Sequence, residues 1–230
     1  MTTRSCFVLC AATLVVVAPC AAQGSVEFAS FAGVYVPASN VIDVSAQCPG
    51  GPCGEMVRQH VAPVFGARVT AWGRKRVALD LSLGYSRSAV TRHGLLAEVP
   101  SGMLVGPTST DATGTADIVT GSARVLLSLT PRTDRASCYV AAGLALVTHR
   151  GAAYSNVVGN TGWGPVVGAA GRFRLAPALA LRAELDDYVY SLSGTAATRP
   201  PAYSLGVVAG NYRSPLQHDL VLSLGLSVAP

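Results

Sequence analysis

The stretch Leu179-Ala-Leu-Arg-Ala-Glu-Leu-Asp186 decides the fold, because its alternate residues have opposite chemistry. Leu179, Leu181, Ala183 and Leu185 form one set, and Ala180, Arg182, Glu184 and Asp186 form the other. Successive side chains of a β-strand point to opposite faces, so this pattern predicts a strand with one apolar face and one charged face. The segments Val77–Tyr85 and Leu220–Val228 repeat the alternation, with small or polar residues between aliphatic ones.

Alternation of this kind predicts eight strands, which occupy 25–37, 62–73, 77–88, 115–130, 137–149, 164–175, 179–192 and 218–229. Each is long enough to cross a bilayer as a tilted strand, which takes about 9 to 11 residues. The second, fourth and sixth segments are followed by tight connections at 74–76, 131–136 and 176–178. The other connections are long and rich in Gly, Ser, Thr and Pro. This strict alternation is typical of the periplasmic turns and extracellular loops of outer-membrane barrels. We therefore predict an all-β fold, an eight-stranded antiparallel up-and-down transmembrane β-barrel in the bacterial outer membrane.

The composition agrees with strands in lipid. Hydrophobic residues make up 50% of the chain and charged residues only 13%, whereas soluble domains carry about 25% charged residues. After the first residues no apolar stretch reaches the ~18 residues of a membrane helix. The net charge of +5 comes from arginine, since Lys75 is the only lysine, and the longest basic run is Arg74-Lys75-Arg76. We therefore expect membrane lipids and no nucleic acid as partners.

The amino terminus has the features of a secretory signal peptide. Arg4 precedes an apolar run from Phe7 to Val17, and small residues follow at Ala21 and Ala22. We predict a signal peptide over 1–22, cleaved after Ala22, and a barrel domain over 23–230. A retained anchor is disfavoured by the short run and by Pro19, and lipidation at Cys20 is disfavoured by the preceding proline.

One face of the strands carries few aliphatic residues, and the side chains on it are mostly small, with a few charged ones among them. If it faced water, as in a lipocalin-like barrel with leucines inside, Lys, Glu, Thr and Gln would be common on it. It holds Gly, Ala, Ser and a few charges, which suit the narrow lumen of eight strands. Glu27 is one of the charges, and the predicted ion pairs of the lumen are formed among Arg68, Asp80, Arg124, Arg172, Arg174, Arg182, Glu184 and Asp186. Arg172 and Arg174 are expected beside Glu184, on the neighbouring strand.

Most aromatic residues lie near the predicted strand ends. Rings there are expected at the lipid headgroups. The aromatic residues considered, of which most but not all lie near a strand end, are Phe28, Phe31, Tyr35, Phe65, Trp72, Tyr85, Tyr139, Trp163, Tyr188, Tyr190 and Tyr203.

Three cysteines follow the signal peptide, in an oxidising compartment. Cys48 and Cys53 enclose Pro-Gly-Gly-Pro, so we predict a local disulfide between them. A zinc site is the alternative, but His60 is the only further ligand nearby. Cys138 is expected as an unpaired thiol near a strand end.

The sequence contains few features that indicate a catalytic site. Nucleophile-elbow, metalloprotease and nucleotide-binding motifs are absent. His149 stands at the outer end of one predicted strand, and Asp187 and Ser191 near that end of another, which leaves open a rim dyad of the kind used by lipid A-modifying barrels. We predict no enzyme, no cofactor and no metal site.

The chain resembles the outer-membrane protein β-barrel family, the group that includes the OmpA transmembrane domain and OmpX. The resemblance covers Ser25–Pro230 and is carried by Ala-Ala-Gln-Gly at 21–24, by Leu181–Tyr188 and by His218–Val228. It implies that the barrel-assembly machinery recognises the last strand, although this chain ends in Ala229-Pro230 rather than an aromatic residue. The predicted role is structural or surface-interacting, with long extracellular loops, a plugged polar lumen and an unknown extracellular ligand. The alternatives are a narrow porin-like channel for small solutes and a lipid A-modifying enzyme.

Overall fold

The structure of the chain is a computed structural model. It describes residues 25–40, 42–48, 51–73, 76–96, 108–131, 134–151, 154, 160–192 and 216–229. The predicted signal peptide lies outside these residues, as does Tyr203. Across the described segments, no helix has the length and apolar character required to cross a membrane.

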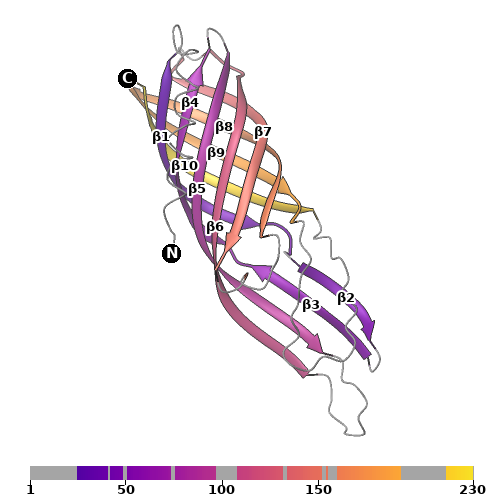
Figure 1. Cartoon of the computed structure of the whole chain (residues 1–230). Coiled ribbons are helices and arrows are strands. Elements are labelled where there is room, and N and C mark those ends of the chain that lie inside the picture. The colour runs from indigo at the N-terminus through magenta and orange to yellow at the C-terminus, as the bar shows by residue number, and fades with distance from the viewer. Residues whose placement is uncertain are drawn as a thin grey trace, which may run out of the picture.

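Eight long strands form the barrel, which confirms the predicted fold class (Figure 1). They are β1 (Val26–Pro37), β4 (Ala62–Trp72), β5 (Val77–Leu96), β6 (Thr108–Ser128), β7 (Ala136–Arg150), β8 (Thr161–Ala176), β9 (Leu179–Tyr190) and β10 (Gln217–Val228). Each contains most of one predicted segment.

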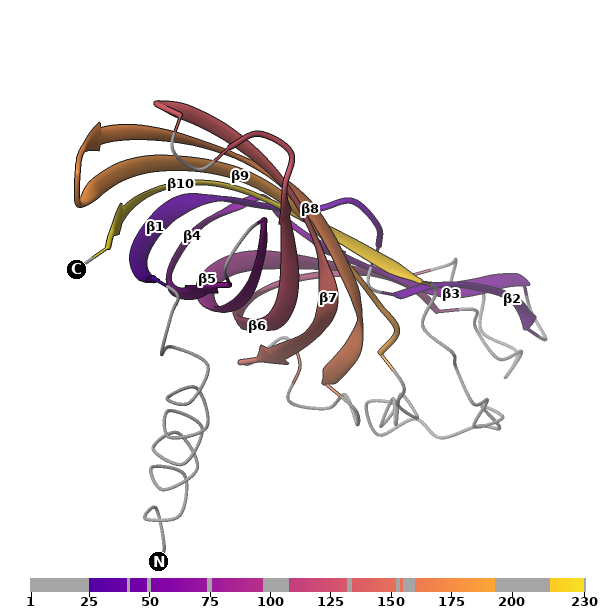
Figure 2. The ribbon, with the colours of Figure 1, turned by 90° about the horizontal axis from the view of Figure 1, so that it is seen from above.

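The sheet closes on itself. The first barrel strand pairs with both of its neighbours, so that Phe28 lies opposite Val228 of β10 and Val69 of β4. The β5–β6 ladder completes the ring, which is seen from above in Figure 2. All of these pairings are antiparallel. Closure gives the backbone N–H and C=O groups of every wall strand a hydrogen-bond partner. A sheet needs this to be stable within the lipid bilayer.

Two further strands extend the sheet beyond the barrel, where the sequence predicted a loop. Strands β2 (Ile42–Cys48) and β3 (Gly51–Gln59) form a hairpin, and β3 pairs with β5 from Val90 to Leu95. The loop prediction is wrong here because the β4–β5 ladder ends at Ser86, which leaves the rest of β5 available to β3. Accordingly β5 runs to Leu96 rather than 88, and β6 begins at Thr108 rather than 115. The result is a sheet of β2, β3, β5 and β6 that projects from one end of the barrel (Figure 1).

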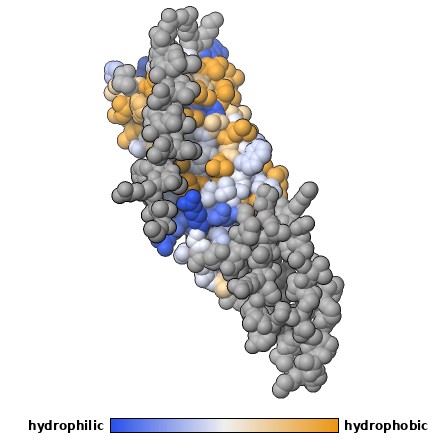
Figure 3. All heavy atoms as spheres, viewed as in Figure 1, coloured by the Kyte–Doolittle hydropathy of each residue, from blue (hydrophilic) through white to orange (hydrophobic). Residues whose placement is uncertain are grey.

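The aliphatic face of the strands points outward. On β5, Leu79, Leu81 and Leu83 are exposed, the last by 59%, whereas Asp80 and Ser82 between them are buried. Figure 3 shows hydrophobic residues over the barrel wall, and hydrophilic ones where the wall gives way to the projecting sheet. This excludes the arrangement with leucines inside and confirms the transmembrane type of barrel.

Many of the aromatic residues expected at the headgroups lie inside the barrel instead. The inward ones are Phe31, Tyr35, Trp72, Tyr139, Tyr188 and Tyr190, all less than a tenth exposed. Phe28, Phe65, Tyr85 and Trp163 do face outward. The prediction considered only distance from a strand end, but the face is set by alternation: Tyr188 shares the inward face with Asp186 and Glu184.

Candidate functional site

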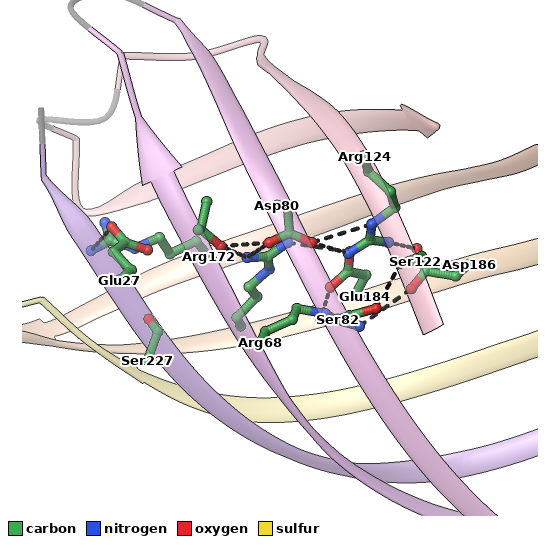
Figure 4. A network of polar contacts seen from close by, with 12 residues as sticks. Glu27, Arg68, Asp80, Ser82, Ser122, Arg124, Arg172, Glu184, Asp186 and Ser227 are labelled. Carbon is green, nitrogen blue, oxygen red and sulfur yellow. Dashed lines mark hydrogen bonds and ion pairs between the residues drawn. The ribbon is translucent and has the colours of Figure 1, made fainter. Parts of the chain in front are cut away.

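A layer of charged side chains crosses the middle of the lumen (Figure 4). Its members are Arg68 on β4, Asp80 on β5, Arg124 on β6, and Arg182, Glu184 and Asp186 on β9. We call these six residues the lumen network. Each of these side chains is at most 3% exposed. In the ring of strands β9 lies opposite β5, so the network joins facing walls of the barrel.

Arg124 lies at the centre of the lumen network. Its guanidinium is 2.5 Å from Asp80 Oδ2 and 2.9 Å from Glu184 Oε1, and it also contacts Asp186. One arginine thus bonds to three acids on two strands. The planar guanidinium has five donors, which allows it to serve several carboxylates at once.

The other two arginines complete the network from the β4 and β9 sides. Arg68 pairs with Glu184 and lies 3.3 Å from Asp186 Oδ2. Arg182 lies 3.2 Å from Glu184 Oε1 and 3.4 Å from Asp80 Oδ1. Thr70 accepts a hydrogen bond from Arg182 at 3.1 Å and donates one to Asp80 at 2.5 Å. Every acid of the network therefore contacts at least two arginines.

The formal charges of the lumen network cancel, because three arginines face three carboxylates. Removing an ion from water into such a confined interior costs several kcal/mol unless it is paired and hydrogen-bonded. Mutual pairing satisfies this requirement within the lumen. Among the described residues, the Nε atoms of Arg68 and Arg182 are buried without a hydrogen-bond partner.

Two of the arginines predicted in the lumen stand apart from this network. Arg172 lies 3.4 Å from Glu27 Oε1, on β1, and Arg174 is half-exposed where the β8–β9 register shifts. The expectation that both flank Glu184 differs from the structure. It considered only neighbours along the ladder, whereas the partners of Glu184 come from β4 and β6 across the narrow lumen, and from Arg182 on its own strand.

Apolar layers lie on both sides of the lumen network. Along β6 the inward residues run from Leu126 through Arg124 to Ile118. Leu126 packs in one cluster with Trp72, Ala78, Tyr139, Ala141 and Ala170. Ile118 belongs to a larger cluster with Phe31, Tyr35, Val64, Val147, Val166, Tyr188, Tyr190 and Val221. The sequence predicted a plugged polar lumen, and the structure has its ionic network between two clusters of buried apolar residues.

A smaller polar group sits in the larger apolar cluster, toward the end with the long connections. Asp219 accepts hydrogen bonds from Tyr35 and, at 2.5 Å, from Tyr190. The Tyr190 hydroxyl also lies 3.2 Å from His149 Nε2. Sequence analysis missed Asp219, although alternation places it on the same face as Val221, Ser223 and Ser227.

The structure does not bring His149 together with Asp187 or Ser191, so the rim dyad is not formed. His149 is fully buried in the lumen, whereas Asp187 is on the outward face of β9 and pairs with His218 at 3.1 Å. Alternation separates them, because Asp187 is one residue from the inward Asp186 and Tyr188. Ser191 forms a backbone bridge to Trp163.

The cysteines occupy different parts of the molecule. The hairpin register sets Cys48 opposite Gly51 and Cys53 opposite Ala46, which makes the two cysteines diagonal neighbours, and their disulfide stays a prediction. Cys138 is an exposed free thiol near the start of β7. In the described parts of the chain, no group of three or more His, Cys, Asp or Glu residues is arranged to hold a metal ion.

Comparison with known proteins identifies the fold. No family model and no curated protein matches the sequence. Among solved structures, the outer membrane protein OprG from Pseudomonas aeruginosa is similar with a TM-score of 0.57 and 12% identity, over 89% of this chain and 95% of that one. The outer membrane protein AlkL, determined in lipid bilayers, is similar with a TM-score of 0.54 and 18% identity, over 90% of both chains. The fold is that of small bacterial outer-membrane β-barrels.

Proposed function

From this shared fold, we propose that the chain is an outer-membrane β-barrel with a structural or surface-interaction role and without catalytic activity. Lipids of the outer membrane would surround its aliphatic wall, and a signal peptide at 1–22 would direct its export. The barrel-assembly machinery would recognise β10 during insertion.

The lumen network is the observation that carries this proposal. A solute crossing the barrel would have to separate buried ion pairs that join β4, β5 and β6 to β9. It would also have to pass the apolar layers on either side. Breaking buried pairs without replacing their partners costs about 3 to 5 kcal/mol each. A packed lumen of this kind supports a structural role over a narrow channel.

The projecting sheet supports the surface-interaction part of the proposal. The hairpin β2–β3 and the outer parts of β5 and β6 stand beyond the wall, at the end of the barrel where β1, β7 and β9 end (Figures 1 and 2). That end would face the cell exterior, because the short turns lie at the opposite end of the barrel. The start of the first strand, Val26, and the end of the last strand, Val228, lie at that opposite end as well.

Planar-bilayer recording of the purified full chain tests the proposal. We expect no steady, large single-channel currents from the wild-type protein. A matched double variant, Arg124→Gln with Asp186→Asn, removes one charge of each sign from the lumen network and shows whether any small current passes through it. Steady wild-type currents that this variant alters would overturn the proposal and make the protein a channel.

A further inference from the structure

The periplasmic rim of the barrel is basic. Arg76, which precedes β5, and Arg135, which precedes β7, are both exposed. The sequences of the same two turns also contain Arg74, Lys75 and Arg132. Asp134 is the one exposed acid among the residues described in these turns. Glu27, which belongs to the same end, is buried in the lumen and pairs with Arg172.

These arginines lie where the apolar wall ends. The Arg135 guanidinium lies 4.9 Å from the centroid of the Phe173 ring, and Phe173 faces outward. Arg76 is followed directly by the outward Val77, and its carbonyl accepts a hydrogen bond from the Ser128 amide at 2.7 Å. An arginine whose stem covers apolar surface holds its charge at the level of the lipid headgroups.

We propose that this rim binds anionic phospholipid headgroups of the inner leaflet through Arg76 and Arg135. Guanidinium groups match the geometry of phosphate oxygens and pair with them through two parallel hydrogen bonds. Phospholipids fit this position because their acyl chains would lie along outward residues such as Val77 on β5 and Phe173 on β8, while their phosphates meet the neighbouring arginines. The inference rests on the orientation given under Proposed function.

The test uses the full chain folded in zwitterionic micelles, titrated with a soluble short-chain phosphatidylglycerol and with a phosphatidylcholine of equal chain length. We expect tighter binding of phosphatidylglycerol, weakened by salt. The Arg76→Gln/Arg135→Gln variant should lose roughly fivefold in affinity for each arginine removed. The matched control, Arg87→Gln/Arg150→Gln, removes two exposed arginines from the opposite end of the wall and should bind as the wild type does.

Equal affinity for the two lipids would overturn the inference, as would an equal loss in both double variants. Inorganic phosphate that displaces phosphatidylglycerol at equal concentration would indicate a site for free anions and would also overturn it. So would tighter binding of anionic peptidoglycan fragments than of the lipid. Insertion of the wild type into phosphatidylcholine bilayers distinguishes failure of this inference from failure of the proposed function. A chain that does not insert refutes the proposed function. A chain that inserts but binds both lipids equally refutes only this inference.

Discussion

Glu184 is the residue on which all three arginines of the lumen network converge. Replacing Glu184 with Gln keeps the size of the side chain but leaves these arginines with two carboxylates. Breaking a buried pair in this way typically costs about 3 to 5 kcal/mol. We expect the variant to unfold at lower urea concentration by a corresponding amount, as measured by tryptophan fluorescence in lipid vesicles.

The control for Glu184→Gln is Asp117→Asn, because Asp117 pairs with Arg87 at 3.8 Å on the exposed face of the wall. Its unfolding free energy should change by at most about 1 kcal/mol, since exposed pairs contribute little. Equal stability of the Glu184→Gln and wild-type proteins would mean that water fills the lumen.

Gly143 and Gly121 offer a second matched pair at the residue scale. A Cβ at Gly143 would collide with the backbone of Ala123 and Arg124 on β6, whereas one at Gly121 would meet nothing within 4 Å. Gly143→Ala should therefore destabilise the barrel by about 1 to 3 kcal/mol, and Gly121→Ala should leave it unchanged or slightly more stable. Comparable urea midpoints for the two variants would contradict the register of β6 and β7.

Alternation predicted the inward position of most lumen charges, and it puts Arg182 and Glu184 of one strand on the same face, where they pair, but it did not predict the partners that reach across the lumen. It placed Arg68, Asp80 and Arg124 on one face because that property is local to each strand. Which charges meet across a barrel depends on its diameter and on the stagger of its strands, and no single segment contains that information. This is why Arg172 was expected beside Glu184 and instead pairs with Glu27.

At the scale of elements, the eight wall strands were predictable because lipid and lumen impose opposite chemistry on their two faces. The β2–β3 hairpin and the outer parts of β5 and β6 lie beyond the wall, where this constraint is absent. The dense Pro and Gly of Cys48–Cys53 therefore indicated a loop, although Cys48 belongs to β2 and Gly51, Pro52 and Cys53 belong to β3.

The hairpin cysteines give a prediction at this scale. If Cys48 and Cys53 are oxidised to each other, alkylation of the denatured, unreduced mature protein should label one thiol, that of Cys138. Changing both to Ser should leave the urea midpoint of the barrel unchanged, because a disulfide over so short a loop restricts the unfolded chain little. Three labelled thiols would contradict the disulfide, and a large loss of stability would mean that the hairpin is part of the barrel core.

For the whole molecule, we predict sedimentation with outer membranes and a faster electrophoretic mobility before heating than after it. A closed barrel resists detergent unfolding because its wall strands have no free edge. Soluble protein in the periplasm would contradict this prediction.

Orientation is tested separately, in a Cys138→Ser background. A membrane-impermeant maleimide should label Thr113→Cys, in the projecting part of β6, on intact cells. It should label Asp134→Cys, in a short turn, only after permeabilisation. The reverse result would invert the barrel and remove the basis for a rim that contacts inner-leaflet lipids.

The two longest strands, β5 and β6, run without interruption from the membrane wall into the projecting sheet. At about 3.3 Å per residue, strands of 20 and 21 residues span roughly 65 Å, about twice the ~30 Å hydrocarbon thickness of a bilayer. In mechanical terms the projection is a cantilever rooted in the barrel, with no hinge at its base. A pulling force at its tip would be carried as shear along the hydrogen-bonded seams of β5 with β4 and of β6 with β7.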